Sequence, residues 1–201
     1  AFENNDLTSV EISDTVHTIG DQAFKDNDIT TLVLRAGSIA STTIGDFAFY
    51  GNNNLKSVTI PGSVRTIGYG AFSTLSIDTL VIEEGVQRIE DYAFDHNNLK
   101  HIILPSTLTY VGRSAFAHNP LEDVDLGGVQ HIGAFAFYDH SLASGHIIDL
   151  PEPVNYIGEG AFWTSSVNVY ARQKGLPDFI HDDAFKATYV ARGSESGPGC
   201  N

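Results

Sequence analysis

The stretch Thr18–Phe24 reads TIGDQAF, and close variants of it return along the chain. Thr43–Phe49 reads TIGDFAF, Thr66–Phe72 reads TIGYGAF and Arg88–Phe94 reads RIEDYAF. The copies end at Phe24, Phe49, Phe72, Phe94, Phe116, Phe137, Phe162 and Phe185, and Ala1-Phe2 closes one more. Successive copies lie 21 to 25 residues apart. A recurrence this regular indicates a repeat array rather than a single globular core.

A second phrase lies between the Ala-Phe pairs and has the alternation of a short half-buried strand. Its apolar positions are Leu7/Val10/Ile12, Ile29/Leu32/Leu34, Leu55/Val58/Ile60, Ile77/Leu80/Ile82, Leu99/Ile102/Leu104 and Leu121/Val124/Leu126, with weaker copies at Ile148/Leu150 and Val167/Val169. Asn27, Asn97 and their counterparts predict a tight turn before each strand, because Asn tolerates left-handed backbone. A second extended piece, such as residues 64–67, follows a Pro or Gly bend. The x-x-Ala-Phe segment is expected to form one helical or 3₁₀ turn.

One such unit cannot bury its apolar face alone, whereas stacked units cover one another. The sequence therefore predicts a mainly β repeat solenoid, a right-handed coil with a parallel β-sheet and short helical or 3₁₀ turns. We expect the array to occupy residues 1–189, with its first repeat truncated, and residues 190–201 to form a Gly/Ser/Pro-rich tail or linker.

The repeat resembles the BspA-like leucine-rich repeats, a bacterial surface-protein type of about 22–23 residues. LKHIILPSTLTYVGRSAF (Leu99–Phe116) and LKSVTIPGSVRTIGYGAF (Leu55–Phe72) match the family phrase almost throughout. The resemblance implies an extracellular or cell-surface location and adhesion or binding to host or neighbouring-cell surface proteins or glycans. It implies no catalytic motif and no particular ligand.

Composition and charge reduce the classes of partner and site that can be expected. The formal net charge is −14, so a nucleic acid is not an expected partner, since binding it needs cationic side chains to neutralise phosphates. No apolar run is long enough to span a membrane, and we expect no membrane insertion. Cys200 is the single cysteine, so no disulfide framework or cysteine-rich metal site is expected. The sequence leaves the state of Cys200 and the oligomeric state open.

The sequence lacks the catalytic motifs of the common hydrolases and nucleotide-binding enzymes, so we expect neither catalysis nor a cofactor. Two groups of residues could still bind a cation. Asp123 and Asp125 share one face of a strand, with Asp149 expected nearby, but a solvated acidic face is the preferred interpretation. His96 and His118 occupy matched places in adjacent copies, where a repeat position that tolerates His is preferred over a metal pair.

Two outward rows are the candidate ligand-binding sites. The first follows the strands and includes the apolar residues Val33, Val81 and Ile103, with β-propensity as the alternative explanation. The second precedes each Ile-Gly step and reads Thr18, Thr43, Thr66, Arg88, Tyr110, His131, Tyr156 and Phe179. Its last five members are planar or aromatic groups that could grip a protein or stack on sugar rings. A self-stacking ladder that stabilises the edge of the solenoid is the alternative. Tyr138 and Trp163 are weaker candidates.

These observations favour a non-catalytic ligand-binding or adhesion module of a secreted or surface-exposed microbial protein, which engages a protein or glycan through its exposed faces. Two alternatives stay open at this point. The array could be a structural spacer, or it could be an accessory substrate-binding domain of a larger secreted enzyme.

Overall fold

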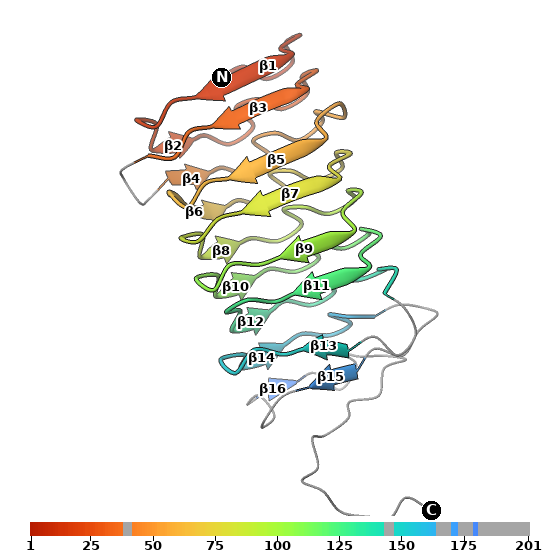
Figure 1. Ribbon diagram of the computed structural model, residues 1–201. Coiled ribbons are helices and arrows are strands. Elements are labelled where there is room, and N and C mark those ends of the chain that lie inside the picture. The colour runs from red at the N-terminus through yellow and green to blue at the C-terminus, as the bar shows by residue number, and fades with distance from the viewer. Residues whose placement is uncertain (38–41, 143–146, 164–169, 173–178, 181–201) are drawn as a thin grey trace, which may run out of the picture.

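The computed structural model describes residues 1–37, 42–142, 147–163, 170–172 and 179–180, and they form an elongated solenoid of β-coils (Figure 1). Each coil contributes one strand to each of two sides. The strands of one side are β1 (Ser9–Ile12), β3 (Thr31–Leu34), β5 (Ser57–Ile60), β7 (Thr79–Ile82), β9 (His101–Ile103), β11 (Asp123–Asp125), β13 (Ile147–Asp149) and β15 (Tyr170–Arg172). Those of the other side are β2 (Thr18–Ile19), β4 (Thr42–Ile44), β6 (Val64–Ile67), β8 (Arg88–Ile89), β10 (Tyr110–Val111), β12 (His131–Ile132), β14 (Tyr156–Ile157) and β16 (Phe179–Ile180). The predicted repeat solenoid with parallel strands is thereby confirmed, while the predicted tail, residues 190–201, lies outside the described residues.

All the strand pairs are parallel, as predicted, but the two sides differ in continuity. The even-numbered strands form one eight-stranded sheet in unbroken order from β2 to β16. Within the described ranges the odd-numbered strands pair two by two, as β1 with β3, β5 with β7, β9 with β11 and β13 with β15. The continuous sheet therefore lies on the side of the Ile-Gly step.

A column of phenylalanines fills the axis of the solenoid. The rings of Phe2, Phe24, Phe49, Phe72, Phe94, Phe116, Phe137 and Phe162 stack in succession, with centroids 5.0 to 5.6 Å apart and ring planes within 11° of parallel. From Phe49 to Phe162 each ring is fully buried. Each Phe thus covers its neighbours, which is why the Ala-Phe pair recurs in every coil.

The corner before each Phe is not the helical or 3₁₀ turn that the sequence suggested. It consists of two linked turns, in which Ala23 N–H donates to Gly20 O at 3.2 Å and Lys25 N–H to Gln22 O at 3.3 Å. Gln22 has a φ of 54°, and the same position is left-handed in the following coils. A left-handed residue in the middle interrupts any right-handed helix, and among the described residues no helix is assigned.

The asparagines before the strands form a buried ladder rather than the left-handed residues of a turn. The positive φ falls one residue earlier, at Asp26 (53°) and His96 (53°). Asn97 is buried, and its Oδ1 accepts a hydrogen bond from Ile77 N–H in the preceding coil at 3.0 Å. Its Nδ2 donates to two phenylalanine carbonyls, one in its own coil and one in the preceding coil. Asn27, Asn52 and Asn119 make equivalent bonds. The ladder satisfies backbone groups that have no strand partner.

Candidate binding surfaces

The row before the Ile-Gly step stands in register on the eight-stranded sheet, as the sequence predicts. Arg88 pairs with Tyr110, Tyr110 with His131, and His131 with Tyr156 along the strands. The Arg88 guanidinium carbon lies 3.9 Å from the centroid of the Tyr110 ring. The Tyr110 and His131 centroids are 4.7 Å apart, and those of His131 and Tyr156 are 4.2 Å apart with parallel planes. We call Arg88, Tyr110, His131 and Tyr156 the stacked ladder. The backbone of Phe179 continues the register beside Tyr156.

Stacking changes the electrostatics of the ladder. Burial, followed by the nearby Arg88 cation, lowers the pKa of His131 below its ordinary value, which favours the neutral imidazole. Burial raises the pKa of Tyr110, and the carboxylates of Asp91 and Glu90 add to this effect. Arg88 is held from its other side by Glu90, whose Oε1 lies 2.9 Å from Arg88 Nε. Both ring faces of His131 are covered by its neighbours, so ligands meet mainly ring edges.

An acidic groove continues from the ladder toward the N-terminus. It is lined by Asp21, Thr43, Ile44, Gly45, Asp46, Thr66, Gly68, Tyr69, Glu90 and Asp91, and has a volume of about 410 Å³. Its aspartates are fixed by the backbone: Asp46 N–H donates to Asp21 Oδ1 and Tyr69 N–H donates to Asp46 Oδ1, both at 2.9 Å. The threonines Thr43 and Thr66 stand in register in its floor, where the planar groups of the ladder end.

The strands of the opposite side carry a partly apolar outward row, as the sequence predicts. We call Glu11, Val33, Thr59, Val81, Ile103, Asp125 and Asp149 the outer row, and all seven side chains are exposed. Ile103 is 73% exposed, Val81 48% and Val33 40%. The register places Glu11 beside Val33 and Asp125 beside Ile103, so carboxylates stand at both ends of the apolar part.

Of the two candidate cation sites, the structure brings potential metal ligands close together at the histidine pair but not at the three aspartates. Asp123 and Asp125 do project from the same face of β11. In the described part of the chain, however, the one cluster of three His, Cys, Asp or Glu side chains close enough to share an ion is Asp95, His96 and His118, not the Asp123, Asp125 and Asp149 set. The sequence pointed to the two histidines of that cluster and missed Asp95.

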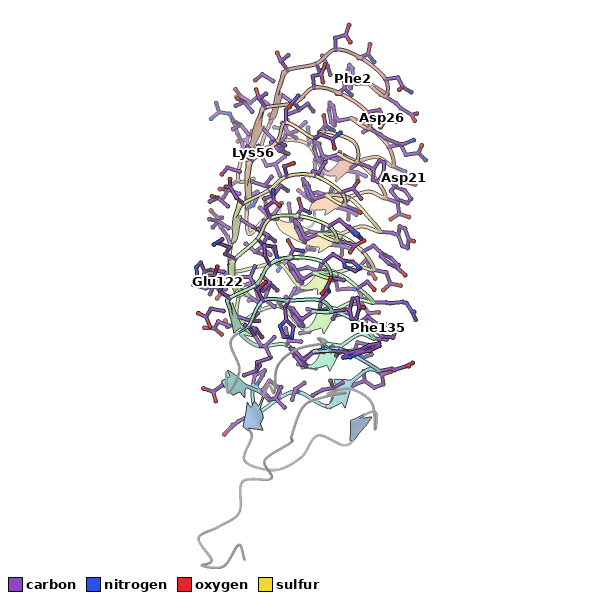
Figure 2. The ribbon with its side chains drawn as sticks, turned by 90° about the vertical axis from the view of Figure 1, so that its right-hand side faces the viewer. Phe2, Asp21, Asp26, Lys56, Glu122 and Phe135 are labelled. Atoms are coloured by element: carbon purple, nitrogen blue, oxygen red, sulfur yellow. The ribbon has the colours of Figure 1, made fainter. Side chains whose placement is uncertain are left out.

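A second aromatic surface lies at the corner next to each core Phe, and of its residues only the weaker candidates Tyr138 and Trp163 were named from the sequence. Phe47, Tyr69 and Tyr92 follow one another there with centroids 5.1 and 5.4 Å apart. Further along, Phe135, Tyr138 and Trp163 form another contact group. Figure 2 shows Phe135 and Asp21 on this side of the solenoid, opposite Lys56 and Glu122 on the side of the odd-numbered strands.

Comparison with known proteins agrees with the geometry of the coils. The profile of the BspA type leucine-rich repeat region, counted in 6 copies, matches residues 1–97, 36–144 and 67–190. The chain belongs to this family. The resemblance seen in the sequence is thereby confirmed. Comparison with curated protein sequences gives no match.

Two solved structures are similar to this BspA type repeat chain. The first is the pneumococcal vaccine antigen PcpA, with a TM-score of 0.62 and 18% identity over 83% of this chain. The match covers 45% of PcpA, so the chain spans about half of that protein. The second is a leucine-rich cell surface protein from Faecalibacterium prausnitzii A2-165, with 19% identity, a TM-score of 0.46 and coverage of 94% of this chain and 80% of that one. At such identities PcpA supports the leucine-rich repeat fold alone.

No helix in the described ranges is long and apolar enough to cross a lipid bilayer. The described coils are built from strands and turns.

Proposed function

We propose that this BspA type repeat array is a non-catalytic ligand-binding or adhesion module of a secreted or surface-exposed microbial protein. Its ligand is a protein on a host or neighbouring cell, and the outer row is the contact surface. The family assignment and the fold shared with the pneumococcal antigen support a repeat module of a surface protein.

The exposed apolar part of the outer row is the observation that carries this proposal. Val33, Val81 and Ile103 point outward on the side of the odd-numbered strands, with Thr59 between Val33 and Val81, and Ile103 is 73% exposed. Apolar side chains that gather on a sheet surface gain free energy when a partner covers them. A strand needs no large apolar residue at an outward position, since Thr59, Glu11 and Asp125 occupy the same place in other coils.

The charges around the outer row indicate the chemistry of the partner. Asp125 stands at one end of the apolar part and Glu11, which is ion-paired with Arg35, stands at the other, and the whole chain carries a formal charge of −14. A partner with an apolar centre and a lysine or arginine toward Asp125 would match this pattern, and long-range attraction would speed its association.

The stacked ladder is less suited to a glycan than the sequence suggested. Stacking on a sugar needs a free aromatic face, whereas both faces of His131 are covered by Tyr110 and Tyr156. A glycan remains the second candidate ligand, and the acidic groove beside the ladder is where its hydroxyl groups would find acceptors.

The test is a binding screen against extracellular-matrix proteins and a glycan array, with variants of each surface in parallel. Ile103→Asp places a charge in the outer row, and the fold tolerates it because Asp125 holds the same position one coil later. Asn54→Asp adds the same charge at an exposed site away from the row. The double variant Tyr110→Ala/Tyr156→Ala removes the rings of the ladder.

We expect a protein ligand whose affinity falls at least about tenfold in Ile103→Asp, as for a contact hot spot, and stays unchanged in Asn54→Asp. Binding that is lost only in the ladder variant, while its circular dichroism spectrum is unchanged, would overturn the assignment of the outer row. Failure to bind any member of the screen would contradict the binding function.

A structural spacer is the second candidate function, and the ladder itself favours it. Arg88, Tyr110, His131 and Tyr156 satisfy one another and stiffen the continuous sheet without any ligand. A spacer predicts that Tyr110→Ala/Tyr156→Ala changes only thermal stability, and that Ile103→Asp changes nothing measurable.

A further inference from the structure

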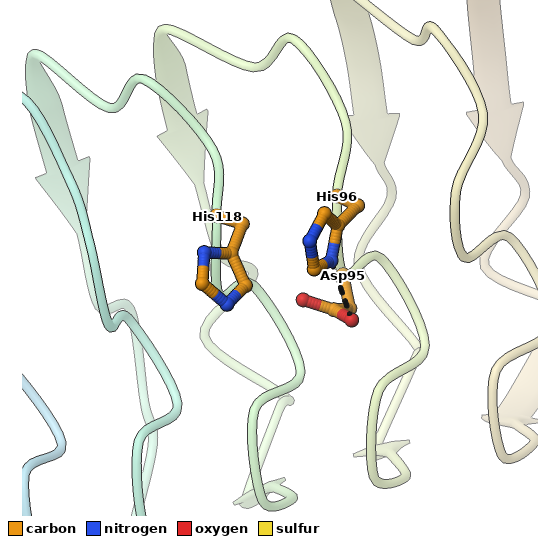
Figure 3. A group of neighbouring side chains, drawn as sticks. All are labelled: Asp95, His96 and His118. Carbon is orange, nitrogen blue, oxygen red and sulfur yellow. Dashed lines mark ion pairs between the residues drawn. The ribbon is translucent and has the colours of Figure 1, made fainter.

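Asp95, His96 and His118 bring three metal-binding side chains together on two neighbouring coils (Figure 3). One potential ligand atom from each lies within 4.8 Å of the others. His96 Nδ1 is 2.9 Å from Asp95 Oδ2, and the two imidazole centroids are 4.1 Å apart. The other carboxylate oxygen of Asp95 lies on the side of His118 (Figure 3).

The repeat explains why the two histidines meet. Each occupies the second position after a core Phe, where the backbone is left-handed, with φ of 53° at His96 and 54° at His118. Backbone bonds between coils, such as His96 N–H to Ala117 O at 3.0 Å, hold these two positions one above the other. The corresponding residues in other coils are Asn4, Asp26, Gly51, Thr74 and Asp139. Imidazoles on adjacent coils are thus a local departure from the repeat.

Asp95 provides a second, independent observation that indicates a bound cation. The residue is only 8% exposed, and its Oδ1 is a buried side-chain atom that has no hydrogen-bond partner in the described structure. Leaving a carboxylate oxygen buried and unpaired costs free energy unless a cation or donor satisfies it. The equivalent positions of the two neighbouring coils hold the uncharged Ser73 and Ala117, so the solenoid does not need a carboxylate there.

His118 is already oriented for this role. Its Nδ1 lies 3.2 Å from Asp139 Oδ2 on the next coil, which leaves Nε2 free to face an ion. A carboxylate on the far nitrogen of a histidine is the usual outer support of a metal-binding imidazole. His96 Nδ1 also lies close to a carboxylate, 2.9 Å from Asp95 Oδ2.

We propose that Asp95, His96 and His118 form a binding site for a divalent transition-metal ion of the Zn²⁺ class. The ion takes Nε2 of His118, one ring nitrogen of His96 and the unpaired Oδ1 of Asp95, and water completes its coordination. Two nitrogens and one oxygen suit Zn²⁺, Cu²⁺ or Ni²⁺ better than Mg²⁺ or Ca²⁺, which prefer shells made of oxygen. A bound ion would link the two coils at this edge.

Closing the site requires a small inward rotation of the rings. Bonds to Zn²⁺ of about 2.0–2.1 Å place tetrahedral ligand atoms roughly 3.3 Å apart, closer than the present limit of 4.8 Å. The side chains of His96 and His118 are 55% and 35% exposed, so their rings have room to turn, whereas Asp95 is fixed by its burial.

The experiment is a calorimetric titration of the full, untagged chain with ZnCl₂. It is done in a Cys200→Ser background, because a free thiolate would bind Zn²⁺ by itself. His118→Asn and Asp95→Asn are the test variants, and Asn suits the left-handed position of His118, as Asn4 shows. His17→Asn, which removes an exposed histidine far from the cluster, is the matched control.

We expect one strong Zn²⁺ site in the background protein and in His17→Asn, and affinity at least tenfold weaker in His118→Asn and Asp95→Asn. The ring proton resonances of His96 and His118 should shift together at one equivalent of Zn²⁺. If Asp95→Asn fails to fold, the variant of the half-buried His118, His118→Asn, decides. Unchanged Zn²⁺ affinity in His118→Asn, or no Zn²⁺ binding by the background protein, would overturn the proposal.

Discussion

Replacing Asn97 with Leu tests whether the buried asparagine ladder is needed to hold adjacent coils together. Leu has the same branching and the same number of side-chain heavy atoms as Asn, and the fold accepts it at this place, because Leu75 occupies the equivalent position one coil earlier. The backbone N–H that would otherwise need an Asn at position 75 belongs to Leu55, and it donates instead to the backbone carbonyl of Asn52 at 3.0 Å. The substitution therefore removes hydrogen bonds without creating a large cavity.

The cost follows from counting the backbone groups that lose their partner. Asn97 accepts from Ile77 N–H at 3.0 Å and donates to Phe72 O at 2.8 Å and Phe94 O at 3.1 Å. Phe94 O keeps a second donor, Asn119 Nδ2 at 2.9 Å. Two buried groups are left unpaired, at about 1–3 kcal/mol each, so the free energy of unfolding should fall by about 2–6 kcal/mol.

The measurement is urea unfolding followed by circular dichroism and by the fluorescence of Trp163, the single tryptophan of the chain. Coincident transitions would justify a two-state analysis, which repeat arrays do not always obey. Asn98→Leu is the control, because Asn98 is exposed and its change should stay within about 0.5 kcal/mol. An Asn97→Leu variant as stable as Asn98→Leu would refute the role of the ladder.

Two further predictions concern the sheet of the even-numbered strands. Because burial and the Arg88 cation lower the pKa of folded His131, the unfolded chain binds this proton more strongly. The stability that neutral His131 contributes is complete above its ordinary pKa of 6.5 and is lost as the pH falls through its pKa in the folded state. In the variant His131→Phe, the free energy of unfolding measured in urea should therefore fall less on acidification than in the wild type. An acid dependence identical in wild type and variant would contradict this. Gly112→Ala should destabilise by about 1–3 kcal/mol, because a Cβ there would lie 2.5 Å from the backbone nitrogen of Asp91. Gly20→Ala, where a Cβ meets open space, should be close to neutral in the same denaturation assay.

The coils could be predicted from the sequence because one residue class serves one purpose in every copy. The Phe column, the strand alternation and the outward rows all follow from the 21- to 25-residue interval. The backbone conformation of the corners was harder to predict. Its φ angles are set by the need of each coil to turn back on itself, and the left-handed position accepts residues as different as Gln22, Phe47 and Ser114. Residue type therefore carried little information about the corner conformation.

The aromatic and acidic side chains that sequence reasoning missed were missed for a different reason. Phe47 and Tyr92 are the second residue of their x-x-Ala-Phe segment, whereas Tyr69 is the first, so no single column of the repeat contains them. Their rings meet only because the linked turns direct both positions to one corner. Asp95 was missed for a related reason: its burial depends on that same corner, and most of its counterparts are not acidic.

In a solenoid, function should be sought where neighbouring coils depart from the repeat together. Hydrogen bonds between the backbones of adjacent coils hold equivalent positions in register. A single unusual residue therefore remains isolated, whereas unusual residues at the same position of two or three successive coils lie side by side and form a surface. Tyr110, His131 and Tyr156 become a stack in this way, with centroids 4.2 and 4.7 Å apart. His96 and His118 become a metal-ligand pair by the same rule. Inserting one residue between these two histidines would move one imidazole away from the other while both histidines stay in the sequence. Loss of Zn²⁺ binding would then show that the site depends on the register of adjacent coils and not merely on the presence of two histidines.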